Sequence, residues 1–197
     1  RQTDIEAYDT VNVKRYIGNA WQDMSSPSVG INSQSKIAIA DDNTPYILIW
    51  HYTDAGRSNT VKKWNGTAWQ FIGEFESTRP AFIAIDHNNV PYIAYLNAAL
   101  QDAITVKRRI GESWQTVGID GMSPSDCILH SFLIDASNKP VIAYNSNFAP
   151  ATIKKFDGNQ WLSETEIPES LTSSEDVKLA FDSNNILYAS SGNVVLK

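Results

Sequence analysis

Two patterns of apolar and polar positions alternate along the chain, and both are typical of short antiparallel strands. The first is a β-rich strand, a Gly-containing turn and a returning strand that carries a Trp, as in residues 61–70. Its centre is Asn65-Gly66, a strong signal for a tight hairpin. The second is an apolar strand, a turn rich in Asn and Asp, and a returning strand that Pro opens, as in residues 82–95. No convincing helix is present, so the patterns predict an all-β fold.

Both patterns recur in the same phase, which predicts a repeat. The first returns at residues 13–22, 61–70, 106–115 and 153–162, with intervals of 48, 45 and 47 residues between its Trp positions. The second returns at residues 37–47, 83–95, 132–144 and 179–189. Four strands in a unit of about 46 residues are the signature of β-propeller blades. We therefore expect a β-propeller in which each unit is one four-stranded blade.

The boundaries of the units are set by the strand order. Within one unit we assign strands A, B, C and D to residues 82–86, 90–95, 104–109 and 113–118. We expect a single repeat array over residues 1–197, with a partial blade at 1–24, blades at about 36–73, 81–118 and 130–164, and a partial blade at 177–197. Both ends supply strands B and C, so they overlap instead of completing one blade. This predicts an incomplete propeller, part of a larger ring; a five-bladed ring with irregular end blades is the alternative.

Composition narrows the class of partner. The chain has 42% hydrophobic and 19% charged residues, which excludes intrinsic disorder. Its net charge of −6 argues against a nucleic-acid partner, which needs a basic face. No apolar run approaches the roughly 20 residues of a membrane helix, so we expect no membrane insertion. The single Cys127 excludes an intrachain disulfide framework and a Cys-cluster metal site.

Residues that recur in every unit are expected to serve the fold. A Trp at one phase of each repeat predicts packing between blades more than sugar binding. Asp86, Asp135 and Asp182 precede Asn-rich turns, but a calcium site needs about six to eight oxygens, and Ala40 stands in the first copy. These Asp residues therefore predict Asx turns. The basic pairs 14–15, 62–63, 107–108 and 154–155 could form a stripe for phosphate or acidic glycan; we expect a solvated face instead.

Function is expected where the repeat is broken. The A–B and C–D turns are short, whereas the B–C and D–A connections vary in length and share one face of a propeller. Variable loops on a rigid scaffold are where binding residues concentrate. Asp102 and Asp126 lie there, and the candidate ligand-binding residues on this face are Trp50, His51, Tyr52, Arg57, Arg79 and His130. We expect His130 at the channel mouth. Such a cluster could bind a glycan or a peptide carboxylate.

Catalytic signatures are weak. His87 lies in a short turn on the opposite face, and the two other His with scattered Asp form no metal-binding pattern. No GxSxG, P-loop or HExxH motif is present. We expect no metal, no cofactor and no catalytic residue. Carboxylates that meet across the channel leave a glycan-active hydrolase or lyase open as an alternative.

The repeat resembles blades of secreted bacterial propeller-repeat proteins of the Bacteroides and Flavobacterium kind. The segments that carry the resemblance are Val61-Lys62-Lys63-Trp64-Asn65-Gly66-Thr67-Ala68-Trp69 and Asp86-His87-Asn88-Asn89-Val90-Pro91-Tyr92-Ile93-Ala94-Tyr95. The resemblance covers essentially the whole chain. It implies an extracellular, cell-surface or periplasmic location, a binding or adhesion role, and no catalytic residue to transfer.

The repeat and the resemblance together support the hypothesis of a non-catalytic binding or scaffold module. Its ligand, a glycan or a protein, is expected on the face of the B–C and D–A loops. The chain lacks the paired Gly of kelch repeats and the Gly-His and Trp-Asp marks of WD40 repeats. Five-bladed Trp-rich lectins share a similar repeat length. A lectin with equivalent sugar pockets between successive blades therefore stays open as the alternative.

Overall fold

The structure is built from strands. A computed structural model describes residues 11–27, 32–54, 56–146, 150–163, 177–191 and 194–196. Within these ranges the regular elements are β-strands and one short 3₁₀-helix, η2 (Ala98–Leu100). No helix in the described part of the chain is long and apolar enough to cross a membrane. The all-β prediction is confirmed.

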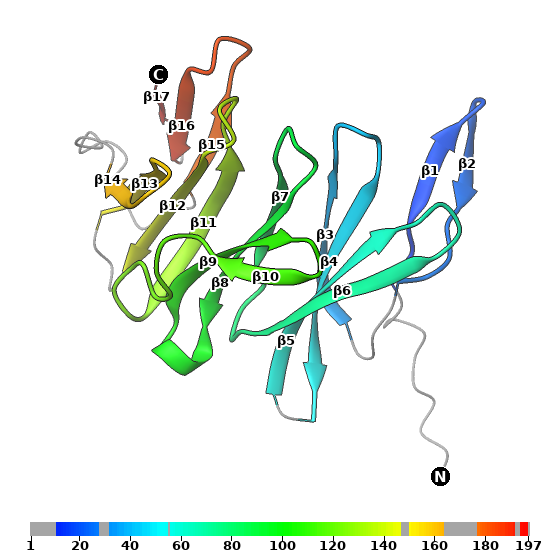
Figure 1. The fold of residues 1–197 in the computed structure, drawn as a ribbon, viewed down its shortest axis with the longest axis horizontal. Coiled ribbons are helices and arrows are strands. Elements are labelled where there is room, and N and C mark those ends of the chain that lie inside the picture. Colours follow the sequence, from blue (N-terminus) through cyan, green and yellow to red (C-terminus); the bar gives the residue numbers. More distant parts are fainter. Residues whose placement is uncertain are drawn as a thin grey trace.

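The strands form antiparallel sheets that succeed one another along the chain (Figure 1). The first sheet is β1 (Lys14–Ile17) and β2 (Ala20–Asp23). The second is β3 (Asn32–Ile39), β4 (Pro45–Thr53), β5 (Gly56–Trp64) and β6 (Trp69–Glu76). The third is β7 (Phe82–Ile85), β8 (Pro91–Asn97), β9 (Ala103–Ile110) and β10 (Ser113–Thr116). The fourth is β11 (Cys127–Ile134), β12 (Pro140–Ser146), β13 (Thr152–Phe156) and β14 (Trp161–Ser163), and the fifth is β15 (Lys178–Phe181), β16 (Leu187–Ser191) and β17 (Val194–Leu196).

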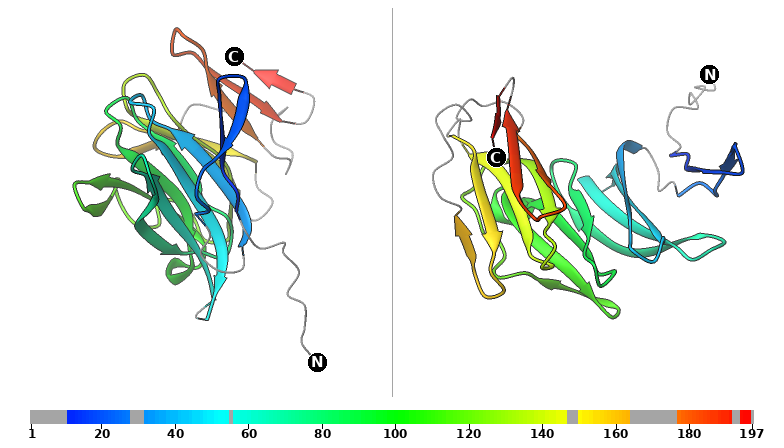
Figure 2. Two further views of the ribbon diagram at one scale, coloured as in Figure 1. Left: turned by 90° about the vertical axis from the view of Figure 1, so that its right-hand side faces the viewer. Right: turned by 90° about the horizontal axis from the view of Figure 1, so that it is seen from above.

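The sheets stand side by side in chain order. Each four-stranded sheet pairs its strands in sequence, which confirms the expected A-to-D order. Figures 1 and 2 show β1–β2 and β15–β17 at opposite ends of this row. The β3–β4 and β11–β12 turns lie at the top of Figure 1, and the β4–β5 and β8–β9 connections lie at the bottom. We call these two ends the turn face and the loop face. The strand expected near residues 5–8 lies outside the described residues.

Asx turns close strands A and B, as expected. Asp86 Oδ1 accepts the backbone N–H groups of Asn88 at 2.9 Å and Val90 at 2.8 Å. Asp135 and Asp182 repeat this pattern in the fourth and fifth sheets. Each turn also needs a residue with positive φ, a conformation that Asn tolerates well; the residues there are Asn43, Asn89, Asn138 and Asn185, with φ between 60° and 64°.

The same Asn side chains bind the preceding sheet. Asn89 Oδ1 accepts the Asp42 N–H at 3.0 Å, and Asn138 Oδ1 accepts the His87 N–H at 2.8 Å. Asn185 Oδ1 accepts the Ala136 N–H at 2.9 Å. Two requirements therefore favour Asn at this position: a left-handed backbone conformation and a hydrogen bond to the preceding sheet.

Three of the four repeated Trp side chains, Trp69, Trp114 and Trp161, pack between sheets as predicted, whereas Trp21 does not. Trp114 Nε1 donates to the Ile72 carbonyl at 2.7 Å, and Trp161 Nε1 donates to the Val117 carbonyl at 2.9 Å. The Phe75 and Trp114 rings meet edge to face at 5.1 Å between centroids. Trp21, in the first sheet, is 67% exposed. Each of the two bonded indoles thus reaches back to strand D of the sheet before it, within β6 for Ile72 and directly after β10 for Val117.

Glycine makes room for these indoles. A Cβ on Gly118 would lie 2.9 Å from Trp161 Cδ1, and a Cβ on Gly73 would overlap Trp114 Nε1. The two glycines occupy the same place in successive sheets, directly after the carbonyl that accepts the indole N–H. Gly73 is not among the positive-φ residues, so its requirement is space.

We expect Gly73→Ala to lower the free energy of unfolding by about 1–3 kcal/mol, the usual cost of forcing extra atoms into a packed interface. Urea unfolding measures the change. In a Trp114→Leu background the added methyl group meets a smaller side chain, so the cost should shrink. An equal cost in both backgrounds would show that the indole is not what Gly73 accommodates.

Candidate functional site

The end of the β4–β5 hairpin gathers three of the predicted residues. Trp50 and Tyr52 are two apart on β4 and therefore point to the same side, and Arg57 on β5 pairs directly with Tyr52. The Trp50 and Tyr52 ring centroids are 5.9 Å apart. Trp50 is buried, whereas Tyr52 is 46% exposed. The strand register thus assembles an aromatic pair with a cation beside it.

Arg57 lies over both rings. Its Cζ is 5.1 Å from the centroid of Trp50 and 5.1 Å from that of Tyr52. Its Nη2 donates to the Tyr52 hydroxyl at 3.3 Å, and its Nη1 donates to the Thr78 carbonyl at 3.4 Å. A cation over two aromatic faces with two hydrogen bonds has few rotamers left. The guanidinium is therefore held in place at the surface.

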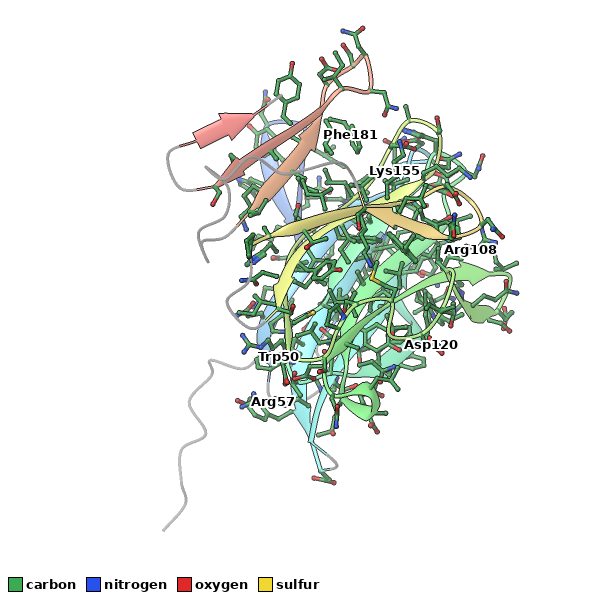
Figure 3. All side chains as sticks on the ribbon, turned by 90° about the vertical axis from the view of Figure 1, so that its left-hand side faces the viewer. Trp50, Arg57, Arg108, Asp120, Lys155 and Phe181 are labelled. Carbon is green, nitrogen blue, oxygen red and sulfur yellow. The ribbon has the colours of Figure 1, made fainter. Side chains whose placement is uncertain are left out.

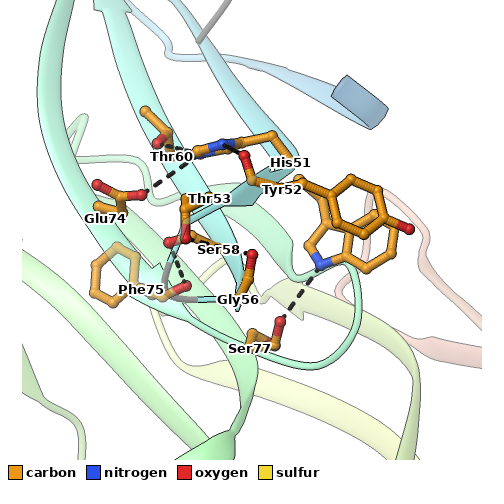
Figure 4. A network of polar contacts seen from close by, with 10 residues as sticks. His51, Tyr52, Thr53, Gly56, Ser58, Thr60, Glu74, Phe75 and Ser77 are labelled. Atoms are coloured by element: carbon orange, nitrogen blue, oxygen red, sulfur yellow. Dashed lines mark hydrogen bonds and ion pairs between the residues drawn. The ribbon is translucent and has the colours of Figure 1, made fainter. Parts of the chain in front are cut away.

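The segment after β6 is tied to the same hairpin (Figure 4). Trp50 Nε1 donates to the Ser77 carbonyl at 3.4 Å, and Ser77 Oγ donates to the Arg79 carbonyl at 2.8 Å. The buried Asn59 donates to the Arg79 carbonyl at 3.1 Å and accepts the Ala81 N–H at 2.9 Å. Arg79 thus joins the site through its backbone, while Asn59 and Ser77, which the sequence did not single out, fix the loop.

His51 points to the other side of the strand and into the protein. Its Nδ1 lies 3.2 Å from the Tyr52 carbonyl, which only accepts, so Nδ1 carries the proton. Its Nε2 lies 2.9 Å from Thr60 Oγ1 and 3.5 Å from Glu74 Oε1. His51 is buried and does not share the surface of Trp50 and Tyr52.

His130 is also buried, on β11 of the fourth sheet. Its Nε2 lies 2.9 Å from Asn145 Oδ1 on the neighbouring strand β12, next to an irregularity in the strand register. Asp102 and Asp126 occupy left-handed loop positions of the third sheet and the segment after it. The structure therefore brings Trp50, Tyr52, Arg57 and the Arg79 backbone together, and it places both histidines in polar contacts of the interior.

A groove opens beside Arg57. It has a volume of about 270 Å³ and is lined by Thr53, Gly56, Arg57, Glu76, Ser77, Thr78 and Ala98. Ala98 belongs to η2, so the groove lies between the loop ends of the second and third sheets. Its lining includes one cation, one carboxylate and the hydroxyl groups of Thr53 and Thr78, whereas the buried Ser77 hydroxyl is bonded to the Arg79 carbonyl.

Glu76 also lines a second hollow, which has a volume of about 550 Å³. Its lining residues are Phe71, Gly73, Glu74, Phe75, Glu76, Tyr95, Asn97, Lys107 and Trp114. Phe71 is 62% exposed. Burial and the nearby Asp120 raise the pKa of Tyr95 to about 12, so this phenol is neutral at physiological pH. Aromatic surface beside carboxylate and amide oxygens is the lining that a ligand rich in both C–H and O–H groups requires.

No protein-family model matches the chain, and no curated protein matches it in sequence. Solved structures do match. The fucose-specific lectin of Aleuria aurantia has a TM-score of 0.63 at 13% identity, over 95% of this chain and 69% of the lectin. Another structure of that lectin is described as a six-bladed β-propeller. The α-L-arabinanase of Penicillium chrysogenum, in complex with arabinobiose, has a TM-score of 0.58 at 12% identity, over 94% of this chain and 68% of the arabinanase.

The fold is consistent with an incomplete β-propeller. At this identity the likeness concerns the fold alone. From here on we call the second, third, fourth and fifth sheets blades.

The basic pairs on strand C of the second to fourth sheets do not form a plain solvated face, so that expectation was wrong there. Lys155 Nζ lies 2.7 Å from Asp135 Oδ2, whose side chain is fully buried. Lys154 Nζ donates to the Met122 carbonyl at 3.1 Å, and Lys107 Nζ lies 3.7 Å from Asp120. Burial lowers the pKa of Lys62. The partners of these bases are the Asx-turn residue Asp135 and two residues of the connection after β10, Asp120 and Met122.

Asp135 is bound to protein donors. Burial alone would raise its pKa, but hydrogen bonds from Lys155 and from the backbone of Lys139 and Ser137 outweigh burial and leave the pKa below 3.8. Within the described ranges no group of three or more His, Cys, Asp or Glu is placed to hold a metal ion.

We expect Asp135→Asn to lower the free energy of unfolding at pH 7 by about 1–3 kcal/mol, because a hydrogen bond to a buried charge is lost. The folded-state pKa of Asp135 is depressed, so its stabilising effect is present above the unfolded-state pKa and disappears as pH falls through the folded-state pKa. Denaturant unfolding between pH 7 and pH 2 should therefore show the two proteins converging.

The control for this prediction is Asp23→Asn, which breaks the exposed pair with Lys14. Exposed pairs contribute about 0–1 kcal/mol, so this variant should change little. A difference for Asp135→Asn that does not depend on pH would contradict the assigned ionisation.

Proposed function

We propose that the chain is a non-catalytic carbohydrate-binding module of the propeller type. The observation that carries the proposal is the pair of hollows, of about 270 and 550 Å³, between the second and third blades. Glu76 lines both, and the proposed ligand is longer than one sugar ring and contacts both hollows. The likeness of the fold to a fucose-specific lectin and to an arabinanase supports a glycan as the ligand class.

We call the two hollows together the track. Its lining suits an uncharged or weakly charged sugar. Phe71 offers exposed aromatic surface, and Glu76 and Asn97 offer oxygens that accept from hydroxyl groups. Arg57 stands at the loop end of the track with its guanidinium already fixed by Trp50 and Tyr52. A preorganised donor costs less conformational entropy on binding than a free one.

The strand lengths that frame the track differ from those of the next blade, which supports a ligand site over a by-product of the repeat. Strand β6 runs over eight residues, Trp69–Glu76, whereas β10 of the next blade runs over four, Ser113–Thr116. After β10, Val117 and Met122 turn inward to join the core. The long β6 is what carries Phe75 against Tyr95 and Trp114 of the third blade, with Glu74 and Glu76 on either side of it in the sequence.

The second candidate function is hydrolysis of a glycan. Glu74 and Glu76 are two residues apart on one strand, and both line the larger hollow. Glycoside hydrolases use a pair of carboxylates about 5–9.5 Å apart. The module and the hydrolase predict the same ligand class and differ in whether the bond is cleaved.

We also propose that a further blade of the same kind covers β3. Ile83 packs into the core between the second and third blades. Ile37 holds the same repeat position on β3 and is 55% exposed, and Ile39 is 57% exposed. A larger propeller would supply the missing contact. The resemblance to secreted bacterial repeats supports an extracellular, cell-surface or periplasmic location.

The test is a glycan array with the unmodified chain, Phe71→Ala and Glu76→Gln. We expect each substitution to lower the affinity for the bound glycan by a factor of about ten or more, because each removes one contact of roughly 1.4 kcal/mol or more. Trp50 and His51 are poor choices for this test, because both are buried and their loss disturbs folding.

Tyr16→Ala is the matched control, since Tyr16 is an exposed aromatic residue of the first sheet away from both hollows. An array profile that both track variants leave unchanged, while thermal unfolding shows them folded, would contradict the site. If the chain releases reducing ends from an oligosaccharide and Glu74→Gln abolishes this release, the function is hydrolysis and not binding alone.

A further inference from the structure

Two hollows on the turn face repeat from one blade interface to the next. The first lies between the second and third blades and has a volume of about 250 Å³. The second lies between the third and fourth blades and has a volume of about 340 Å³. Equivalent repeat positions line both: a Tyr and a base from the earlier blade, and the turn Asn, the Pro of strand B and the turn Gly from the later blade.

Each hollow contains two cations, one from each blade. Lys63 and Arg109 line the first, and Arg108 and Lys139 line the second. Lys63 and Arg108 hold the same place on strand C, whereas Arg109 and Lys139 come from different positions. None of the residues described as lining either hollow is acidic. Two unrelated positions therefore give the same local charge.

The cations are held by the surrounding protein. Arg109 donates to the carbonyls of Ile72 and Gly111. Lys63 Nζ lies 5.6 Å from the centroid of the Tyr46 ring. Arg108 hydrogen-bonds the Tyr92 side chain. These contacts of Arg109, Lys63 and Arg108 are with carbonyls, an aromatic ring and a phenol, which are uncharged groups.

Three carboxylates lie nearby: Asp86 contacts the Tyr92 side chain that lines the second hollow, and Asp42 and Asp157 belong to their own turns. Asp42 is close enough to Lys63 for electrostatic attraction, but its Oδ1 accepts the Thr44 N–H at 2.9 Å. Asp157 acts on Lys139 in the same way, and its Oδ1 accepts the N–H groups of Asn159 at 2.7 Å and Gln160 at 2.8 Å. Both are exposed turn residues outside the linings.

We propose that each of the two hollows binds one compact oxyanion, a sulfate or phosphate group. A base from each side and the polar groups of the turn can donate to its oxygens, as charge-assisted hydrogen bonds require. The chain carries a net charge of −6, so general attraction to anions is unfavourable and binding depends on the two local sites. Figure 3 shows Arg108, which lines the second of these hollows, on the opposite side of the view from Trp50 and Arg57. Neither hollow shares a lining residue with the glycan track.

The experiment is a titration of the isotope-labelled chain with sodium sulfate, monitored by amide chemical shifts, with ionic strength held constant by sodium chloride. We expect saturable shifts at Gly111 for the first hollow and at Gly158 and Asn159 for the second. Lys63→Gln should weaken binding at the first hollow alone, and Arg108→Gln or Lys139→Gln at the second alone. Each loss should be roughly tenfold, the effect of one hydrogen bond to a charged group.

The control is Lys14→Gln, which removes one exposed positive charge from the first sheet and should change neither set of shifts. Shifts that rise linearly without saturation would overturn the proposal. The proposal would also be overturned by saturable binding in which Lys63→Gln and Arg108→Gln lower the sulfate affinity no more than Lys14→Gln does. Thermal unfolding must show that all three variants are folded.

A second titration identifies the source of the oxyanion. A sulfated disaccharide that binds more tightly than sulfate, and more tightly than its unsulfated counterpart, assigns the hollows to ester groups on a glycan. Equal affinity for sulfate and for the sulfated disaccharide assigns them to the free anion. Equal affinity for the sulfated and unsulfated disaccharides would overturn the role of the oxyanion.

Discussion

The indole hydrogen bond from one blade to the carbonyl of the blade before it is the interaction on which the rest of this structure depends. A single four-stranded sheet of this size buries too little surface to be stable alone, so the interfaces must supply the stability. At two successive interfaces the Trp ring fills the gap, its N–H satisfies a carbonyl in or directly after strand D of the preceding blade, and a glycine leaves the space. On the turn face the recurrent Asn adds a hydrogen bond between neighbours. Two fixed points per interface determine how far apart adjacent blades stand.

That spacing also creates the surface hollows. On the turn face the interface is regular, and two hollows with related linings result. On the loop face the interface differs from blade to blade, because the connections differ in length. The extended β6 leaves a track between the second and third blades, whereas the longer segment after β10 is folded into the core by Val117 and Met122. Regular positions thus produce the repeated hollows of the turn face, and an irregular strand length frames the track.

Features that depend on local chemistry were predictable from the sequence, whereas side-chain direction and remote partners were not. Hairpins, Asx turns and the packing role of Trp depend on near neighbours or on a strict repeat, and the structure confirms them. His51 was grouped with Trp50 because it occupies the same loop end, but alternation along β4 turns it to the opposite side, toward Thr60. The bond of Lys155 to Asp135 joins two strands and is not visible in the local pattern of charges. A sequence can therefore indicate which residues break the repeat, but the contacts of each side chain depend on register and on the adjacent strand or blade.

The first interface shows what happens when the repeated contact is incomplete. Trp69 packs against the buried Val13, Ile47 and Ile49, so its ring occupies the expected gap. Its Nε1 is nevertheless buried with no hydrogen-bond partner among the described residues. By the repeat, the acceptor should be the carbonyl of Met24, and the next position, glycine in later blades, is Ser25. An unpaired buried donor costs about 1–3 kcal/mol. Trp69 therefore contributes apolar packing at this interface without the indole hydrogen bond of the two later ones, and one of the contacts that set the spacing of those blades is missing here.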